Sequence, residues 1–245
     1  MVFDPSVFWH LLFSTELLAP AFTTLWISVA AMAIGVALGF LGGLARISSH
    51  RPVRWFVTAY LWVFRGTPVL VQIVFWYDAT AELTHNLVNL SAIVAGVIAL
   101  GINEGAYMTE IVRAGLLSVD PGQEEAARAL GMTYPKLMRL VVLPQAIRII
   151  IPPTGNQYLA MLKTTSLLFT ISVPELFMTG TDLYSANFRY FEVLSVLSIW
   201  YLFLSTLFSI LQLQLERRFG EDRTNLGQAK QGPVGRLLLP GGAPQ

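Results

Sequence analysis

Four ionisable residues interrupt long apolar stretches of the sequence: Arg65, Glu104, Glu110 and Lys163. A charged side chain at the centre of a membrane helix costs about 2.5 kcal/mol or more, so each of these groups should face protein or water. One interpretation is that they pair with one another and lock a helix bundle. The other is that some of them line a path for a solute that carries both an ammonium and a carboxylate group.

Polar side chains near these charges could add hydrogen bonds to the same path. Gly66 and Pro68 predict a break in the helix that carries Arg65, and its guanidinium could bond the carbonyl groups that such a break exposes. Buried amides between membrane helices commonly act as packing contacts instead. The further candidates are Gln72, Asn156, Gln157, Thr165 and Ser166.

The longest polar interruption begins at Asp120 and predicts a short, capped helix. Asp120 suits the N-cap, Pro121 suits the first helical position, and Gln123 could complete a capping box. Gly131 is expected to end this helix in the left-handed conformation. A second helix is then expected from Thr133 onward.

This helix–Gly–helix unit carries small residues, Ala126 and Ala127, and is suited to being gripped by another protein. An ordinary solvated loop between two spans is the alternative. Pro144 is expected to limit the second helix, and Pro152 and Pro153 to break the amphipathic segment after it.

Signatures of an enzyme are missing from the sequence. It has no Cys, which excludes disulfides, thiolate catalysis and Cys-ligated metals, and its three His residues lack metal-ligand spacing. No Lys follows a Gly, so a phosphate-binding loop is absent. The net charge of +1 gives no indication of nucleic acid as a partner. We therefore expect no catalytic residue, metal or cofactor in this chain.

The composition places the chain in a lipid membrane. It is 54% hydrophobic and only 13% charged, whereas a soluble domain carries about 25% charged residues. Five segments are long and apolar enough to cross a hydrocarbon core of about 30 Å. Gly35 and Gly39, in the first of them, permit close helix packing. The predicted spans are residues 17–45, 55–77, 91–116, 154–173 and 193–215, joined on one side by the loops 78–90 and 174–192.

Basic residues are distributed unequally between the two sides of this arrangement. Of the 16 Lys and Arg residues, all except Arg65, Lys163 and Arg189 fall on one side. The positive-inside rule then places the N-terminus outside, and both the loop 117–145 and the C-terminus in the cytoplasm. Residues 1–16 are predicted to form an aromatic interfacial helix, and residues 219–245 a disordered cytoplasmic tail.

A resemblance to a known family rests on motifs in a fixed order. Glu125-Ala126-Ala127, Gly131 and Leu143-Pro144 match the EAA motif of ABC importer membrane subunits, E-A-A-x3-G-x9-I-x-L-P, with Val141 in place of Ile. Over residues 17–218 the chain resembles the polar amino acid permeases of the histidine, glutamine, glutamate and arginine group. The other motifs are Phe64–Pro68, Gly105–Arg113, Leu143–Arg148, Pro153–Gln157 and Val173–Leu176.

The resemblance implies an all-α, type I ABC importer domain with five transmembrane helices over residues 17–218. It implies a multi-pass subunit of a prokaryotic cytoplasmic (inner) membrane that takes up a polar amino acid. The expected partners are two ATPase subunits that hold ATP and Mg, a second permease subunit, identical or homologous, and an extracytoplasmic amino-acid-binding protein. Residue 164 is a neutral Thr where many relatives carry Asp or Asn. The residues expected to contact the ATPase are Glu125, Ala126, Ala127, Gly131, Leu143 and Pro144.

Other functions stay open at this stage. The same machine could carry another small amine, such as an opine. A gated channel or secondary transporter is a different class, although no internal inverted repeat supports it. A membrane anchor for an enzyme complex has no need of ionisable residues within its spans.

Overall fold

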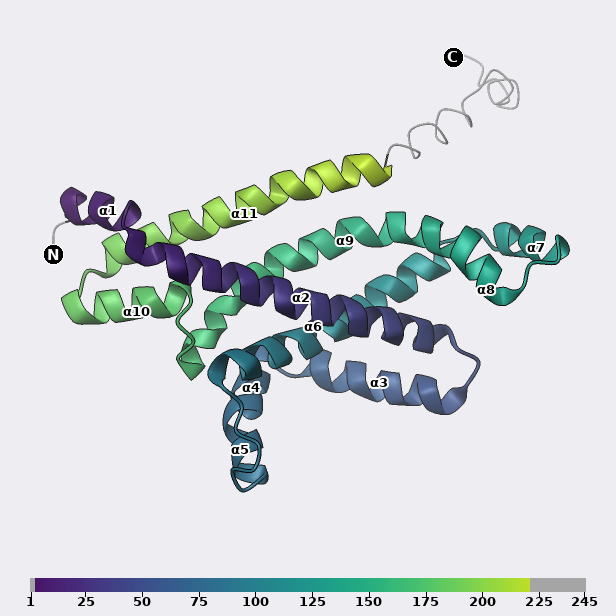
Figure 1. The fold of residues 1–245 in the computed structure, drawn as a ribbon, viewed down its shortest axis with the longest axis horizontal. Coiled ribbons are helices and arrows are strands. Elements are labelled where there is room, and N and C mark those ends of the chain that lie inside the picture. The colour runs from purple at the N-terminus through teal and green to yellow at the C-terminus, as the bar shows by residue number, and fades with distance from the viewer. Residues whose placement is uncertain (1–2, 221–245) are drawn as a thin grey trace, which may run out of the picture.

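The computed structural model describes residues 3–220, and every regular element in that part of the chain is a helix (Figure 1). Four helical runs are long and apolar enough to cross a membrane, and a bent pair of helices makes a fifth if it is counted as one span. The predicted all-α membrane fold is therefore confirmed. The proposed tail, residues 219–245, lies almost wholly outside the described residues.

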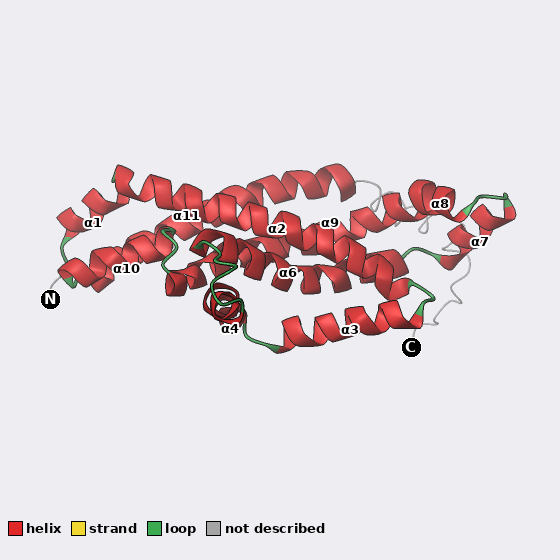
Figure 2. Cartoon of the chain, turned by 60° about the horizontal axis from the view of Figure 1, so that its bottom comes forward, coloured by secondary structure: helices red, strands yellow, loops and turns green. Residues whose placement is uncertain are grey.

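The helices are α1 (Pro5–Leu12), α2 (Leu18–Ile47), α3 (Arg51–Gly66), α4 (Val69–Val74), α5 (Thr80–Leu83), α6 (Ala92–Leu117), α7 (Pro121–Ala129), α8 (Tyr134–Leu137), α9 (Leu143–Thr164), α10 (Leu176–Asn187) and α11 (Tyr190–Gly220). Two π-helical turns, Phe75–Ala79 and Met138–Val142, connect α4 to α5 and α8 to α9. A 3₁₀ segment, Thr165–Ile171, follows α9. Figure 2 shows α2, α6, α9 and α11 running along one another, with α1 and α10 at one end and α7 and α8 at the other.

The centre of the bundle is the pair α2 and α6, which pack through glycines as the sequence predicts. A Cβ atom on Gly35 would lie 2.7 Å from Cγ of Glu104, and one on Gly39 would collide with Met108. These contacts bring the two backbones together because neither glycine has a side chain. Glu104 therefore owes its buried position to the absence of a side chain at Gly35.

The second predicted span is not straight. Helices α3 and α4 meet at 106° across the break at Thr67-Pro68, so α4 and α5 project from the side of the bundle (Figure 1). Pro68 has no backbone N–H and fixes its own φ, and it also disfavours a helical conformation at Thr67. The break that the sequence predicts is present, with a change of direction that the sequence did not predict.

The proline-based predictions for α9 are wrong. Pro144 lies in the first turn of α9, and Pro152 and Pro153 lie inside the helix without ending it. Each of these prolines lacks the N–H that would bond the carbonyl four residues earlier, yet the helix continues through them, as membrane helices can at Pro. The Thr154 hydroxyl donates to Ile150 O (2.7 Å) and the Gln145 amide to Val141 O (3.0 Å), which adds local side-chain bonds to the same helix.

The two predicted loops between spans contain helices, α5 and α10. Glu175, fully buried, begins α10 and fixes its orientation. Its carboxylate accepts hydrogen bonds from Met178 N (2.8 Å), the Tyr201 hydroxyl (2.8 Å) and the Thr24 hydroxyl (3.4 Å). Because these donors belong to α10, α11 and α2, one side chain ties three helices together.

Replacing Glu175 by Ala should therefore lower the yield of folded protein. Each buried donor left without a partner costs about 1–3 kcal/mol. Glu175→Gln keeps an acceptor oxygen and the side-chain volume, so it should lose much less. Thermal unfolding in detergent, followed by size-exclusion chromatography, measures the difference. Equal midpoints for Glu175→Ala and the wild type would show that these bonds do not hold α10.

The N-terminal segment forms α1, which lies against the start of α11 (Figure 1). Arg189 Nη1 lies 3.2 Å from Asp4 Oδ2 and 3.6 Å from Glu192 Oε1. The hydrogen bond from the Ser6 hydroxyl lowers the pKa of Asp4, which favours the ionised form that this contact needs. Trp9 and Phe13 are exposed, as an interfacial helix requires.

Candidate functional site

A polar cavity of about 310 Å³ lies inside the elbow between α3 and α4. Its walls come from the elbow itself, from α6 and from α9. Glu104 is 6% exposed, and its Oε1 atom has no hydrogen-bond partner among the described residues. A buried carboxylate oxygen without a donor is costly, and such groups commonly mark a place where a ligand binds. The lining residues are Thr67, Pro68, Val69, Leu100, Asn103, Glu104, Tyr107, Gln157, Ala160, Met161 and Thr164.

Two helical stripes build most of this cavity. On α6 the lining residues are Leu100, Asn103, Glu104 and Tyr107, and on α9 they are Gln157, Ala160, Met161 and Thr164. Both sets follow the spacing i, i+3, i+4, i+7 that places side chains on one face of a helix. The sequence candidates included Glu104 and Gln157 from these stripes. Extending the helical spacing from Glu104 would have added Leu100 and Tyr107, and Asn103 lies at the same spacing from both of these residues.

The carbonyl groups at the elbow are satisfied by amides and not by Arg65. Phe64 O accepts hydrogen bonds from Asn103 Nδ2 (2.8 Å) and Gln72 Nε2 (3.0 Å), and Gln72 also bonds Thr67. Asn103 and Gln72 bond each other at 3.0 Å. The expected role of Arg65 at these carbonyls is therefore wrong. Its guanidinium carbon lies 5.5 Å from the ring centre of Tyr107, which lines the cavity.

The four charges within the spans do not pair with one another among the described residues. Glu110 Oε2 instead bonds Arg113 Nη2 at 2.8 Å, and Glu110 Oε1 lies 3.7 Å from Arg46. This cluster is at the end of α6 away from the cavity lining. Lys163, close to the end of α9, is exposed. Only Glu104 of the four is buried and faces the cavity.

Of the remaining polar candidates, Gln157 lines the cavity, whereas Asn156, Thr165 and Ser166 do not. Asn156 is exposed on a different face of α9, where Gln212 Nε2 approaches its Oδ1 at 3.5 Å. The Thr165 hydroxyl donates to Leu162 O, and the Ser166 hydroxyl to Lys163 O. These two hydroxyls therefore stabilise the local 3₁₀ backbone. Thr164, which precedes them, does line the cavity.

A second candidate site is the helix–Gly–helix unit, which forms the far end of the bundle as α7 and α8 (Figure 1). The Asp120 carboxylate caps α7 by accepting from Gly122 N (2.8 Å). The expected capping box does not form through the Gln123 side chain; instead Gln123 N bonds Asp120 O. Gly131 has φ +75°, as predicted, and no atom lies within 4 Å of the position that its Cβ would occupy.

The outward face of this unit includes only part of the predicted contact set. Glu125, Ala126, Gly131 and Pro144 are exposed. Ala127 is buried at 4% exposure against the protein's own core, because it packs α7 onto the bundle, and Leu143 is half-buried. Leu130, at the tip, is 79% exposed.

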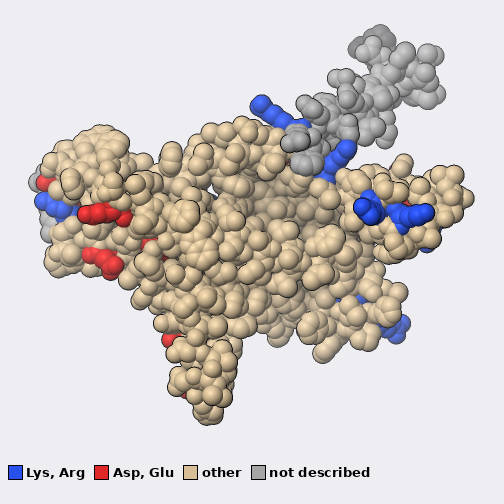
Figure 3. Space-filling view, in the orientation of Figure 1, with Lys and Arg blue, Asp and Glu red and all other residues tan. Residues whose placement is uncertain are grey.

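Charge separates the two ends of the molecule (Figure 3). Lys and Arg side chains gather around α7, α8, the start of α3 and the end of α11, whereas acidic side chains gather around α1, α10 and the α4–α5 projection. The helices between carry few charges. An apolar bundle with charged ends and a polar cavity at the level of its spans is typical of multi-pass membrane transport proteins.

Comparison with known proteins places the chain in a family. Residues 34–221 match the binding-protein-dependent transport system inner membrane component family, and the chain belongs to it. It is therefore a membrane permease subunit. The arginine transport system permease protein ArgU of Corynebacterium glutamicum is 39% identical over 231 residues, which cover 90% of this chain and 73% of ArgU. The glutamine transport system permease protein GlnP of Escherichia coli is 37% identical over 218 residues, covering 89% of this chain and 98% of GlnP.

Solved structures agree with this assignment. The crystal structure of an amino acid ABC transporter with histidines matches with a TM-score of 0.80 and 37% identity, covering 89% of this chain and all of that one. The MetNI methionine ABC transporter, in an inward-facing conformation, matches with a TM-score of 0.72 at 18% identity and 89% coverage, which shows a shared fold.

Proposed function

We propose that this chain is the permease subunit of an ATP-driven importer and that the cavity at Glu104 receives the amino group of a polar amino acid. The observation that carries the proposal is that buried Glu104 lines a polar cavity and that its Oε1 has no hydrogen-bond partner among the described residues. A cation is the group that satisfies such an oxygen best. Relatives that are named for arginine and glutamine transport support an amino acid as the substrate.

The other lining groups fit the rest of an amino acid. Asn103, Tyr107 and Gln157 offer amide and hydroxyl groups to a polar side chain, whereas the Thr67 and Thr164 hydroxyls already donate to Val63 O and Ala160 O. Arg65, which stacks over Tyr107, provides a positive charge at the edge for the substrate carboxylate. The volume of about 310 Å³ is at the small end of ligand pockets, which suits one amino acid.

The other parts of the proposed importer are separate subunits. Two ATPase subunits bind ATP and Mg and contact α7 and the residues Glu125, Ala126, Gly131 and Pro144, which are exposed here. A second permease subunit, identical or homologous, completes the pathway, and an extracytoplasmic binding protein delivers the amino acid. The complex lies in the cytoplasmic membrane of a prokaryote. ATP binding moves α7, and the cavity opens alternately to the two sides.

Binding measurements on the purified complex test the substrate class. The permease is reconstituted with its ATPase, and isothermal titration calorimetry is run with arginine, histidine, glutamine, glutamate and leucine. We expect saturable binding of at least one polar amino acid and none of leucine, because an apolar side chain leaves the cavity amides unpaired. A further titration uses the amine that lacks only the carboxylate of the amino acid that binds. If this amine bound as tightly as the amino acid, the alternative substrate, another small amine, would be favoured. No binding by any of these compounds would contradict the proposal.

Orientation is tested by labelling single Cys residues in intact cells, which is practical because the chain has no native Cys. Ser185 on α10 and Ser49 before α3 are both exposed. The basic residues around Ser49 predict that its end faces the cytoplasm. Ser185→Cys should react with a membrane-impermeant maleimide, and Ser49→Cys should react only after the cells are opened. The reverse pattern would invert the proposed topology.

A further inference from the structure

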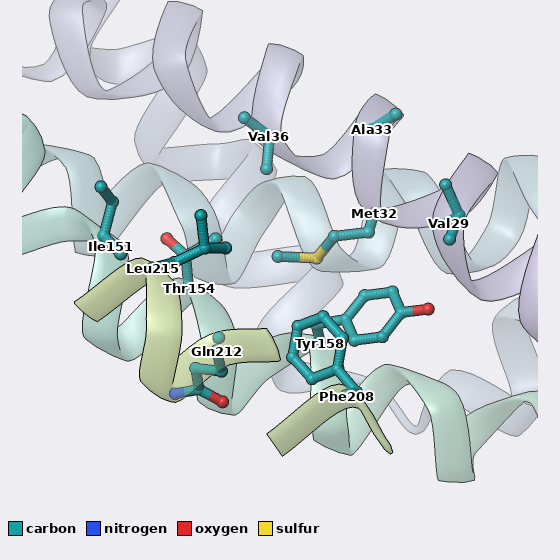
Figure 4. A pocket seen from close by; sticks show the side chains of 11 residues that line it. Val29, Met32, Ala33, Val36, Ile151, Thr154, Tyr158, Phe208, Gln212 and Leu215 are labelled. Atoms are coloured by element: carbon teal, nitrogen blue, oxygen red, sulfur yellow. The ribbon is translucent and has the colours of Figure 1, made fainter. Parts of the chain in front are cut away.

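The face of α9 opposite the Glu104 cavity borders a second, apolar space. It is a groove of about 560 Å³ between α2, α9 and α11 (Figure 4). Figure 1 shows why it exists: α2 and α11 diverge along their length and leave part of α9 uncovered between them. The lining side chains face one another across the space, among them Met32, Val36, Ile151, Phe208 and Leu215 (Figure 4).

Polar groups in the lining are engaged elsewhere. The Tyr158 hydroxyl bonds Ser28 Oγ at 3.0 Å, and the Thr154 hydroxyl donates to Ile150 O at 2.7 Å. The Gln212 amide donates to Glu216 Oε1 at 2.8 Å. A water molecule needs two to four polar partners, which this groove does not offer. The occupant must therefore be hydrocarbon.

Size and depth restrict the occupant further. The groove lies along the middle of α2 and of α9, within segments that are apolar enough to cross a membrane. A single flexible hydrocarbon chain fits in a groove of this size. Leaving the groove empty would forfeit contacts to every side chain that lines it.

Basic side chains near one end of the groove indicate the end at which the hydrocarbon chain of a lipid enters. On α11 the groove ends at Leu215, and Arg217, two residues further on, is exposed. Lys and Arg side chains also gather over the neighbouring α8 (Figure 3). Basic side chains at a membrane surface attract anionic lipid head groups. We propose that the groove is a lipid site, in which one acyl chain of a phospholipid lies between α2 and α11 with its phosphate near Arg217.

Photo-crosslinking tests the site in the assembled complex. The full chain, with its ATPase, is reconstituted in vesicles of phosphatidylethanolamine and phosphatidylglycerol that contain a trace of phosphatidylglycerol with a diazirine in its acyl chain. We expect crosslinks at Met32, Tyr158 or Phe208. Ala33→Trp places a bulky side chain in the groove and should lower these crosslinks about tenfold, equivalent to ~1.4 kcal/mol of binding free energy.

The matched control is Leu41→Trp, which adds the same side chain to an exposed position of α2 outside the groove and should leave the yield unchanged. Val36→Trp repeats the block from another lining position in case Ala33→Trp fails to assemble. Equal crosslinking in all variants would mean bulk lipid only and would overturn the proposal. A disulfide between two Ala33→Cys chains would instead assign the groove to a second copy. A large gain in crosslinking on deleting residues 221–245 would assign it to the chain's own C-terminal segment.

Discussion

A Gly131→Arg permease is expected to insert and dimerise normally, yet to lose its ATPase on purification and to lose all transport. Gly131 is exposed, and the position of its Cβ is open, so an Arg side chain meets nothing within this chain. The same side chain would occupy the space that a docked ATPase needs. Co-purification of the ATPase at matched expression is the measurement, with uptake measured in the same cells.

Two control variants separate the effect of side-chain volume from the effect of backbone strain at residue 131. Gly131 has φ +75°, where a side chain costs about 1–2 kcal/mol. Gly131→Asn tolerates this conformation better, adds little volume, and should keep most of the ATPase. Ser49→Arg adds the same charge to another exposed loop and should keep all of it. ATPase retention and coupled transport in Gly131→Arg would mean that α7 is not the docking site.

Reversing the charge of Glu125, on the same surface, should weaken association with the ATPase by less than Gly131→Arg does. Glu125 is exposed and makes no ion pair among the described residues, so Glu125→Lys should leave the permease fold intact. If Glu125 faces a basic groove of the ATPase, the reversed pair should weaken association most at low salt, where it is least screened. A loss of association that does not depend on salt would indicate a steric cause.

The second large effect concerns Glu104. Glu104→Gln should abolish uptake while leaving the yield and thermal stability of the permease equal to or above those of the wild type. Glu104 Oε1 has no partner among the described residues, so removing its charge relieves a cost of burial. Loss of a buried charge partner for a cation costs about 2–5 kcal/mol, or roughly thirtyfold to several thousandfold in affinity.

Glu110→Gln is the matched control because it removes the same charge from the same helix. Glu110 pairs with Arg113 and Arg46 outside the cavity, so its loss should reduce stability and spare substrate affinity. The two variants should therefore show opposite patterns in binding and unfolding experiments. If Glu104→Gln bound amino acids normally, the cavity would not be the substrate site.

Composition and hydrophobic spans were sufficient to predict the helical membrane fold, because apolar segments of this length have few other stable states. The wrong predictions concern Pro152, Pro153 and Arg65, because the structural effect of each residue depends on the groups packed around it. Pro152 and Pro153 do not break α9, because a membrane helix can continue through Pro where its surroundings compensate for the lost backbone bonds. Arg65 is displaced from the elbow carbonyls by Asn103 of a different helix, a contact that no local pattern predicts. Ala127 turned inward because the rotation of α7 depends on packing.

Glu104 could be selected from the sequence because an unpaired charge in an apolar span requires a reason. Its neighbours in the cavity could have been found by helical spacing along α6, but on α9 only Gln157 was a candidate, and Ala160, Met161 and Thr164 were not. Which face of α9 turns toward Glu104 depends on the unbroken helix through Pro152, and the sequence had predicted a break there. Of the adjacent amides, Gln157 lines the cavity and Asn156 lies on a different face of α9, near Gln212.

The continuity of α8 and α9 has a mechanical consequence. From Tyr134 to Thr164 the helical backbone runs without interruption for about 46 Å, and it packs against α6 at Gly115, where Ile150 and the carbonyl oxygen of Ala146 leave no room for a side chain. A pivot at this crossing would make a lever with two arms of similar length. A swing of about 10° displaces each end by roughly 4 Å, in opposite directions. A push on α8 toward the bundle axis would therefore draw Thr164, and the cavity wall that it belongs to, away from that axis.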